Sequence, residues 1–497
     1  MLVSLSDLYK EDWPDDFSLR SFTLFILDKV VNNKIYEKLQ YGFYTESTEV
    51  GPNPYIPLNE RRPSAPNNIC KKVVDDSVSL LFSEGHFPKI HAEDASTRDA
   101  LRLIAKNYRL NEVMMEAALY GSIGSVAIQT GIINGQLFYL PLKTIYLTPE
   151  FDNEKTRNLI SVTEKKQVCG HDLVDAGYPI KDDDLDEVFW FMRVWNTKEE
   201  IHYKPWKDKD VQNGKFKLVR DDERSTQHNL GFVPIVWIKN LPGGDLIDGQ
   251  SSFSGSVDIM IDRDYLTSQV GRSLRYSADP TLVIKAAGSL AGDDDIIKSA
   301  DRALVIDEDG DAKLLEISGN AAAASDKHVR ALRESAIETI HGNRANTDKL
   351  SVAQSGKAME MMNQDLVWLA DKLRTTYGEG GLVTLLRMTL KMLSSENIKI
   401  NGKFLTKVDV NSDITLVWPP WYSLTPDDLQ KKAIGITTLV NGKLLSRETA
   451  IRELAAEFDI EDVTEEIAKI DAELSKLQLL SDKNETPGGS NNQVNGG

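Results

Sequence analysis

Apolar residues near the middle of the chain recur at intervals of three and four, which places them on one face of a helix. The pattern predicts one helix over residues 327–340 and a second that opens at Ser355, with a polar segment between them. The second helix carries its apolar stripe at Ala358, Met362, Leu366, Leu369, Leu373 and Tyr377. Three glycines follow within residues 378–381. Because each glycine costs roughly 1 kcal/mol relative to alanine, we expect a bend or a break before helix resumes at Leu382.

The first half of the chain changes from helical to strand-like patterning. Helices are predicted at residues 24–31, 67–82, 95–107 and 110–120. Strands are predicted at residues 125–130, 136–140, 144–147, 188–195, 200–204, 216–219 and 234–238. The pair Asn134-Gly135 between the first two strands is a strong signal for a tight hairpin turn.

Another long helix is predicted over residues 251–277, and it carries two apolar stripes. One stripe consists of Ile259, Leu266, Val270 and Leu274, and the other of Val257, Ile261 and Tyr265. Two stripes are typical of a helix with neighbours on both sides, as in a ring of subunits. Short strands at 281–285, 303–306 and 313–317, separated by acidic turns, form a small insert before the next helix.

The C-terminal part returns to helical patterning after a hairpin at 398–405 and a strand at 414–418. Thr425 followed by Pro426 and two aspartates predicts a helix start. Helices are expected up to residue 440, at 446–457 and at 461–479, before a polar, glycine-rich tail that should be disordered. The predicted fold class is therefore α+β.

Composition narrows the class of protein further. The 497 residues are 41% hydrophobic and 27% charged, as in soluble globular proteins. A formal net charge of −18 argues against a conventional static DNA-binding domain, but not against a conduit in which DNA slides with few phosphate contacts. The two cysteines give no disulfide framework, and we expect neither a transmembrane helix nor a secretory signal.

No residue pattern predicts catalysis. The sequence around Gly356-Lys357 lacks the first glycine and the final hydroxyl of a phosphate-binding loop. The seven histidines are scattered, and the aspartates at 182–184 read as a solvated turn rather than a metal site. Asp262 and Asp264 are expected to pair with Arg263 or Arg272 of a neighbouring subunit. The sequence therefore predicts no enzyme activity, no cofactor and no metal.

Several stretches, taken in order, resemble the portal proteins of tailed bacteriophages. They are residues 56–66 and 74–85, Tyr120 to Gly124, Asn229 to Ile235, Ser355-Gly356-Lys357-Ala358-Met359, and residues 418–450. The order helix, small insert, helix, polar loop, long broken helix is also that of the portal family, although the glycine break is heavier than the family usually shows. The resemblance spans most of the chain.

The resemblance implies a particular organisation. It assigns residues 1–250 to an α/β wing, 251–277 and 321–342 to a two-helix stem, and 278–320 to a small α/β clip. Residues 343–354 would be a tunnel loop, 355–424 a long kinked helix with wing strands, and 425–480 a helical crown before the tail at 481–497. Arg344, Asn346, Lys349 and Lys357 would line a channel and touch DNA, although an ordinary surface turn explains this loop equally well. The acidic residues Asp293, Asp294, Asp295, Asp307, Glu308 and Asp309 would dock partners, or only keep the clip soluble.

The resemblance also implies partners and a location. The chain would form a homo-oligomeric ring, most often of about twelve subunits, at one vertex of the virion capsid. Double-stranded DNA would pass through it during packaging and ejection, and the large terminase subunit, a head-completion adaptor, a scaffold and the major capsid protein would contact it. The protein would be made in the bacterial cytoplasm, without contact to a membrane. Two other classes stay open: a different phage capsid or scaffold protein, and a phage-encoded hydrolase, for which no convergent site is visible.

Overall fold

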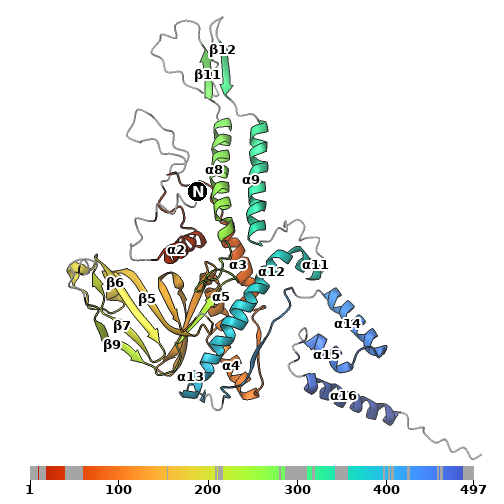
Figure 1. The fold of residues 1–497 in the computed structure, drawn as a ribbon. Coiled ribbons are helices and arrows are strands. Elements are labelled where there is room, and N and C mark those ends of the chain that lie inside the picture. Colours follow the sequence, from red (N-terminus) through yellow and green to blue (C-terminus); the bar gives the residue numbers. More distant parts are fainter. Residues whose placement is uncertain are drawn as a thin grey trace, which may run out of the picture. The chain divides into compact units, whose positions relative to one another are not determined.

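The computed structural model describes residues 9, 18–39, 60–153, 155–207, 210, 217–278, 281–285, 311–315, 319–341, 356–395, 398–400, 403–404, 408–422, 426–455, 458, 460 and 463–484. The chain divides into two compact units, one of residues 1–345 and 362–418 and one of residues 346–361 and 419–497. Helices and strands both contribute, so the predicted α+β class is confirmed (Figure 1).

Four helices form the N-terminal part of the first unit, and all four were predicted. They are α2 (Leu19–Val31), α3 (Ile69–Phe82), α4 (Ala95–Asn107) and α5 (Leu110–Gly121). Side chains cap three of them, because Ser18, Asn68 and Asp94 accept hydrogen bonds from the backbone N–H groups of the first turns. The stripe of α3 is buried as its spacing requires, including Val73, Val78 and Leu81.

A three-stranded antiparallel sheet packs against these helices in the order β10-β2-β3. Strands β2 (Ser125–Ile133) and β3 (Gln136–Lys143) form the predicted hairpin, with Ile133 opposite Gln136. Asn134 and Gly135 have φ of 54° and 76°, the left-handed geometry of a type I′ turn. β10 (Ile235–Lys239) pairs with the other edge of β2.

A second antiparallel sheet has six strands in the order β4-β5-β6-β7-β9, with β8 paired to β6. Its members are β4 (Leu147–Phe151), β5 (Leu159–Cys169), β6 (Val188–Asn196), β7 (Glu199–Tyr203), β8 (Trp206–Lys207) and β9 (Arg220–Gln227). Trp195 of β6 is fully buried in a core that includes Leu147, Val162 and Ile235. Helix α6 (Gly170–Asp175) and the 3-10 turn η3 (Asp182–Asp184) connect β5 to β6.

The sheet corrects three predictions. Residues Thr144–Tyr146 form the 3-10 helix η2 rather than a strand, and the strand begins only at Leu147. The strand predicted at 216–219 lies later, at β9, and β5 was missed altogether. β9 is an edge strand that exposes charged side chains, and β5 buries Glu164 in an ion pair with Arg193, so neither shows an alternating apolar pattern.

The remaining elements of the first unit include the long helices predicted near the middle of the chain. They are the 3-10 helix η4 (Ser254–Ser256), α8 (Val257–Ala278), β11 (Thr281–Lys285), β12 (Asp311–Leu315), α9 (Gly319–Thr339), α12 (Gln364–Leu373), the π-helix η5 (Arg374–Leu382) and α13 (Val383–Ser395). β13 (Lys399–Ile400) pairs with β14 (Lys403–Phe404) as the predicted hairpin, and β1 (Lys89–Ala92) pairs with β15 (Ile414–Val417). The strand predicted at 303–306 lies outside the described residues.

The described part of the second unit is helical. It contains α11 (Gly356–Met362), α14 (Pro426–Asn441), α15 (Arg447–Ala455) and α16 (Val463–Asn484). Helix α14 begins at the predicted proline, and Ser446 caps α15 by accepting from the backbone N–H of Thr449 at 3.1 Å. Helix α16 runs to Asn484, past residue 481 where the tail was predicted to begin, and the rest of that tail lies outside the described residues.

Candidate functional site

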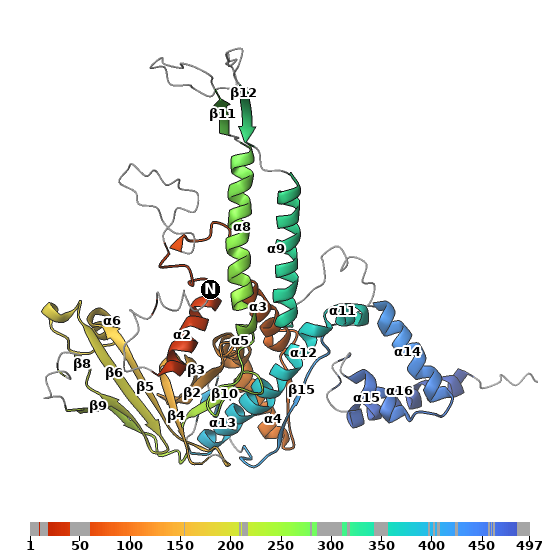
Figure 2. The same cartoon turned by 45° about the horizontal axis from the view of Figure 1, so that its top comes forward.

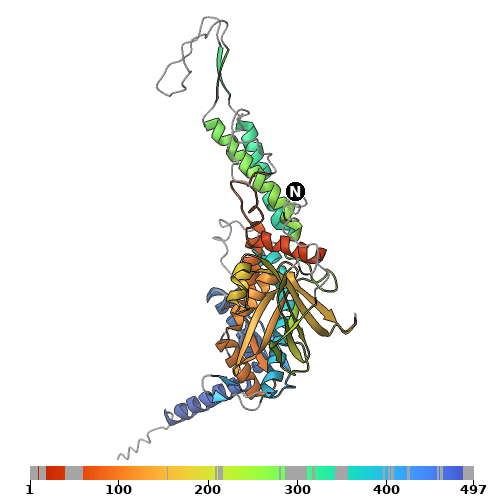
Figure 3. The same cartoon turned by 90° about the vertical axis from the view of Figure 1, so that its left-hand side faces the viewer.

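Two antiparallel helices, α8 and α9, lie side by side along their length, and β11 and β12 pair at their shared end (Figures 1, 2 and 3). At the opposite end the buried Ser256 hydroxyl donates to the carbonyl oxygen of Ala336 at 2.6 Å, which fixes the start of α8 against α9. Figure 2 and Figure 3 show the same pairing from two further directions. The predicted order of helix, insert, helix is therefore confirmed.

The two apolar stripes of α8 have different environments. Val257, Ile261 and Tyr265 are buried within the chain. The other stripe remains half-buried at Ile259, Leu266 and Val270, and Leu274 is 52% exposed. One face of α8 is thus buried by its own chain, and the other is only partly covered, most openly at Leu274.

A buried carboxylate fastens α8 to the segment that precedes α3. Asp264 is 1% exposed and accepts from the Tyr36 hydroxyl at 3.0 Å and from the backbone N–H of Asn67 at 3.1 Å. One turn later, Ser268 Oγ accepts from the backbone N–H groups of Ser64 at 3.0 Å and Ala65 at 3.3 Å. These contacts correct the expectation that Asp264 pairs with a neighbouring subunit, because its partners are in its own chain.

Burial sets the electrostatics around Asp264. Desolvation raises the pKa of Asp264 to about 6, against the lowering effect of its hydrogen bonds and of Arg263. Desolvation, with the neighbouring Asp264 charge, also raises the pKa of Tyr36 above its ordinary value. Asp264 lines a half-open cavity of about 600 Å³ between the beginning of α3 and α8. The pKa of this carboxyl group is therefore closer to neutral pH than that of an ordinary aspartate.

Positive charge gathers where α8 faces α9. The Arg263 side chain is 9% exposed, and its Nη1 lies 3.5 Å from Asp264 Oδ1. Desolvation lowers the pKa of Arg263, and repulsion from Arg333 of α9 lowers it further. Arg263 Nε finds no hydrogen-bond acceptor among the described residues. Arg333 is exposed and forms no ion pair within the described part of the chain.

Of the two outcomes predicted for the glycines in the long helix, a bend or a break, the structure excludes the break. η5 continues α12 into α13 as a π-helix, so the helix is not interrupted at residues 378–381. A Cβ at Gly378 would lie 2.4 Å from Cζ2 of Trp418, and one at Gly381 would lie 2.6 Å from Cδ1 of Ile238. These glycines therefore serve close packing.

Tyr377, next to Gly378, is also closely packed. The tyrosine is fully buried, donates to Asn240 Oδ1 at 3.0 Å and lies directly against Gly121, where any Cβ would collide with its hydroxyl. Its place at the end of the predicted apolar stripe is confirmed, together with buried Leu366, Leu369 and Leu373. The helical stripe is thus tied to both α5 and the segment after β10.

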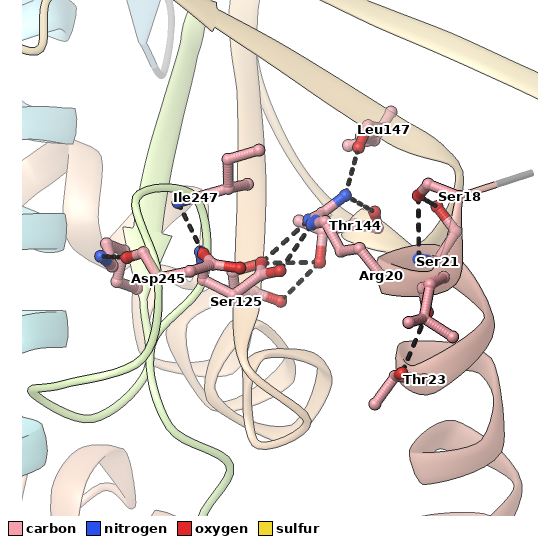
Figure 4. Close-up of polar contacts among 12 residues, drawn as sticks. Ser18, Arg20, Ser21, Thr23, Ser125, Thr144, Leu147, Asp245 and Ile247 are labelled. Atoms are coloured by element: carbon pink, nitrogen blue, oxygen red, sulfur yellow. Dashed lines mark hydrogen bonds and ion pairs between the residues drawn. The ribbon is translucent and has the colours of Figure 1, made fainter. Parts of the chain in front are cut away.

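A polar clamp that the sequence did not reveal joins α2 to the strands (Figure 4). Arg20 forms two hydrogen bonds to Asp248, with Nε–Oδ2 and Nη2–Oδ1 distances of 2.5 Å and 2.9 Å, and Nη1 donates to the carbonyl oxygen of Leu147 at 2.9 Å. Ser125 donates to the same carboxylate. Arg20 and Asp248 are 228 residues apart, so neither spacing nor periodicity could have paired them.

Most of the predicted site residues lie outside the described part of the chain. This is so for Arg344, Asn346 and Lys349 in the polar loop, and for Asp293, Asp294, Asp295, Asp307, Glu308 and Asp309 in the acidic insert. Lys357 belongs to α11, but its side chain is not described. The roles of these residues therefore stay predictions.

Nowhere among the described residues do three His, Cys, Asp or Glu side chains gather closely enough to hold a metal ion. None of the described helices combines the length and hydropathy of a membrane span.

In the aspartate turn at 182–184, Asp184 forms an ion pair with Lys207.

Comparison with known proteins matches this arrangement to a family. The profile described as Phage portal protein, SPP1 Gp6-like, matches residues 4–478, nearly the whole chain. A search of curated proteins finds no significant match. The resemblance to portal proteins is confirmed, and the chain belongs to the SPP1 Gp6-like family of phage portal proteins.

Proposed function

We propose that this chain forms a closed ring of about twelve copies in which the α8–α9 pairs surround an axial channel for double-stranded DNA. DNA would enter through the channel during packaging and leave through it during ejection. The wing would comprise residues 1–250, the stem α8 and α9, and the clip the segment between them. The crown would lie at 425–480.

Family membership supports the general part of this proposal, a structural ring protein of the virion. Phage portal proteins are structural, non-enzymatic proteins of the virion that form an oligomeric ring at a capsid vertex and associate with capsid and terminase. The observation that supports a ring for this chain is the second apolar stripe of α8, which is half-buried at Ile259, Leu266 and Val270 and 52% exposed at Leu274, beside a stripe that the chain itself buries. A helix with a second apolar face requires a second neighbour.

Native mass spectrometry of the purified protein tests the ring. We expect one dominant assembly of about twelve subunits, and negative-stain images should show a central hole. Monomers and dimers alone over a wide concentration range would exclude the ring. A closed shell in the images would instead favour a different capsid protein.

We further propose that residues 343–354 form a loop on the channel wall that contacts DNA only weakly. Arg344 and Lys349 can each neutralise a phosphate, and Asn346 adds uncharged polar contact. Replacing Arg344 and Lys349 together with alanine should leave the ring intact and change the amount of DNA packaged or retained. Packaging assays with the double variant check this, and Asn346→Ala shows separately what the uncharged polar contact contributes. Normal packaging and retention in the double variant would make the loop an ordinary turn.

The acidic insert is proposed as the docking surface for the terminase and later for the head-completion adaptor. Asp293, Asp294 and Asp295 follow β11 in sequence, and Asp307, Glu308 and Asp309 precede β12, so both clusters belong to the connection between the paired strands. Replacing the first three aspartates with asparagine should preserve the ring, weaken partner binding and reduce its salt dependence. Binding measured at two salt concentrations decides between docking and simple solubility. Unchanged affinity and unchanged salt dependence would assign these acids to solubility.

A further inference from the structure

Helix α12 exposes a tryptophan although its other large apolar side chains are buried. Trp368 is 53% exposed. The buried face of the helix contains Leu366, Leu369 and Leu373. At about 100° per residue, Trp368 lies roughly opposite the centre of that face. Because tryptophan is enriched among the residues that dominate binding energy at protein interfaces, this ring marks a contact with another molecule.

The half-open cavity beside Asp264 lies on the far side of α3 from α12. One face of α3 lines the cavity, through Asn68, Lys71, Lys72, Asp75 and Asp76. Cys70, Val73 and Ser77 of α3 are buried and lie about 180° around the helix from that face. Helix α12 packs against α3, and Figures 1 and 2 show α2 and α12 on different sides of it. A chain therefore cannot fill its own cavity with Trp368, but a second copy can.

The cavity has the size and the lining that an indole ring requires. Its volume of about 600 Å³ falls in the range of roughly 300–1,000 Å³ that holds small organic groups. Tyr36 and Met260 give it an apolar wall. Lys71 and the exposed Lys72 also line it, and an ammonium group over the face of a tryptophan is attractive.

Charge is complementary next to the same two features. Asp76 lines the cavity, is partly buried and makes no ion pair within the described part of the chain. Desolvation raises the pKa of Asp76, so its surroundings do not fully balance the negative charge. Lys372 follows Trp368 by one helical turn, is exposed and likewise has no ion-pair partner among the described residues. The lysine of a second copy would supply the missing positive charge.

We infer that Trp368 of one copy inserts into the cavity between α3 and α8 of the next copy, with Lys372 paired to Asp76 beside it. This inference rests on the proposed ring. The inserting and receiving surfaces differ and lie on opposite faces of one copy, so the contact is head-to-tail. Such a contact propagates around a closed cycle, whereas a two-fold dimer requires a self-complementary patch.

Truncation of the tryptophan tests the insertion. Trp368→Ala should raise the concentration needed for half-maximal ring assembly by at least about tenfold, and Trp368→Phe should recover part of this loss because it keeps an aromatic ring. Ile133→Ala is the matched control, since Ile133 is 60% exposed at the end of β2 and should tolerate the change without effect on assembly. Circular dichroism of each variant establishes that it is folded.

Charge reversal tests the ion pair. Lys372→Glu and Asp76→Lys should each weaken assembly by roughly five- to tenfold, and the double variant should recover most of the loss. Lys106→Glu makes the same charge change at an exposed position of α4 and should assemble normally.

Cysteine cross-linking tests the contact with Trp368 in place. Lys372→Cys combined with Asp76→Cys should give a ladder of covalent oligomers after treatment with a short bifunctional thiol reagent. A cross-link inside one copy cannot produce a ladder. Lys372→Cys combined with Asp186→Cys should give none, although the side chain of Asp186 is 99% exposed. The parent single-cysteine variants show any background from Cys70 and Cys169.

The outcomes separate this inference from the ring itself. Normal assembly of Trp368→Ala, or a ladder as strong in the Asp186 pair, overturns the insertion and leaves the ring standing. Normal assembly of Trp368→Ala together with a bound small molecule in native mass spectra would assign the cavity to that ligand instead. A wild-type protein that never forms rings overturns both proposals. Weak assembly of Trp368→Ala, recovery in the charge-swapped double variant and a ladder only in the Asp76 pair establish the contact.

Discussion

Gly378→Ala is expected to destabilise the protein by about 2–3 kcal/mol, although the same change stabilises most helices. The added methyl group would lie 2.4 Å from Cζ2 of Trp418, far inside van der Waals contact. Trp418 cannot move away freely, because its ring lies 5.9 Å from Phe82 and 4.8 Å from the guanidinium of Arg374, measured to ring centroids. Chemical denaturation of the two proteins gives the difference directly.

Gly380→Ala is the matched control in the same π-helix. Its Cβ would meet only the carbonyl oxygen of Thr375, at 3.6 Å, so this variant should gain about 0.5–1 kcal/mol. Trp418→Phe should recover part of the loss when combined with Gly378→Ala, because the atom in collision is then absent. Equal effects of the two glycine substitutions would mean that helix propensity, rather than packing against Trp418, governs this segment.

The packing role of these glycines was not predictable from the sequence. Their number predicts a bend or a break, because glycine is unfavourable in an isolated helix. Tertiary packing keeps the helix unbroken, since Trp418 and Ile238 occupy the space that side chains at Gly378 and Gly381 would need. Both partners are distant in sequence, so no local pattern could have revealed them.

Local signals were otherwise reliable. The three- and four-residue spacing of α3 and α12 predicted buried faces, and Asn134-Gly135 predicted the hairpin, because each depends on neighbours along the chain. The edge strand β9 carries no apolar alternation and was misplaced. Strand pairing there depends on β7, not on local composition.

Only part of the candidate site was predictable from the sequence. The two stripes of α8 indicated a helix with neighbours on two sides, and the chain itself covers one of them. The partners of Asp264 were not predictable, because Tyr36 and Asn67 are 228 and 197 residues away. The roles of the polar loop and the acidic insert depend on DNA and on other proteins, and stay predictions.

Asp264→Asn is expected to change how stability depends on pH. In the folded protein the pKa of Asp264 is raised to about 6 by desolvation, whereas in the unfolded chain it is near 3.8. The folded state therefore binds the proton more tightly between these values, and the contribution of Asp264 to the free energy of unfolding falls as pH rises from about 4 to about 6. Two pKa units correspond to about 3 kcal/mol. Asparagine does not titrate, so the variant should gain about 2 kcal/mol relative to wild type between pH 4.5 and pH 7.5.

The difference between the two proteins must be measured, because other carboxyl groups titrate in the same range. Asp94 has the opposite perturbation: hydrogen bonds from Ser96 and Thr97 lower its pKa to about 2. Its contribution is present above the ordinary aspartate pKa and is lost as pH falls, so Asp94→Asn should lose stability relative to wild type at pH 7.5 rather than gain it. Protein concentration is held fixed throughout, since ring assembly adds a concentration-dependent term. Equal pH slopes for Asp264→Asn and wild type would mean that the buried carboxyl group titrates normally, and that Tyr36, Asn67 and Arg263 together offset its desolvation.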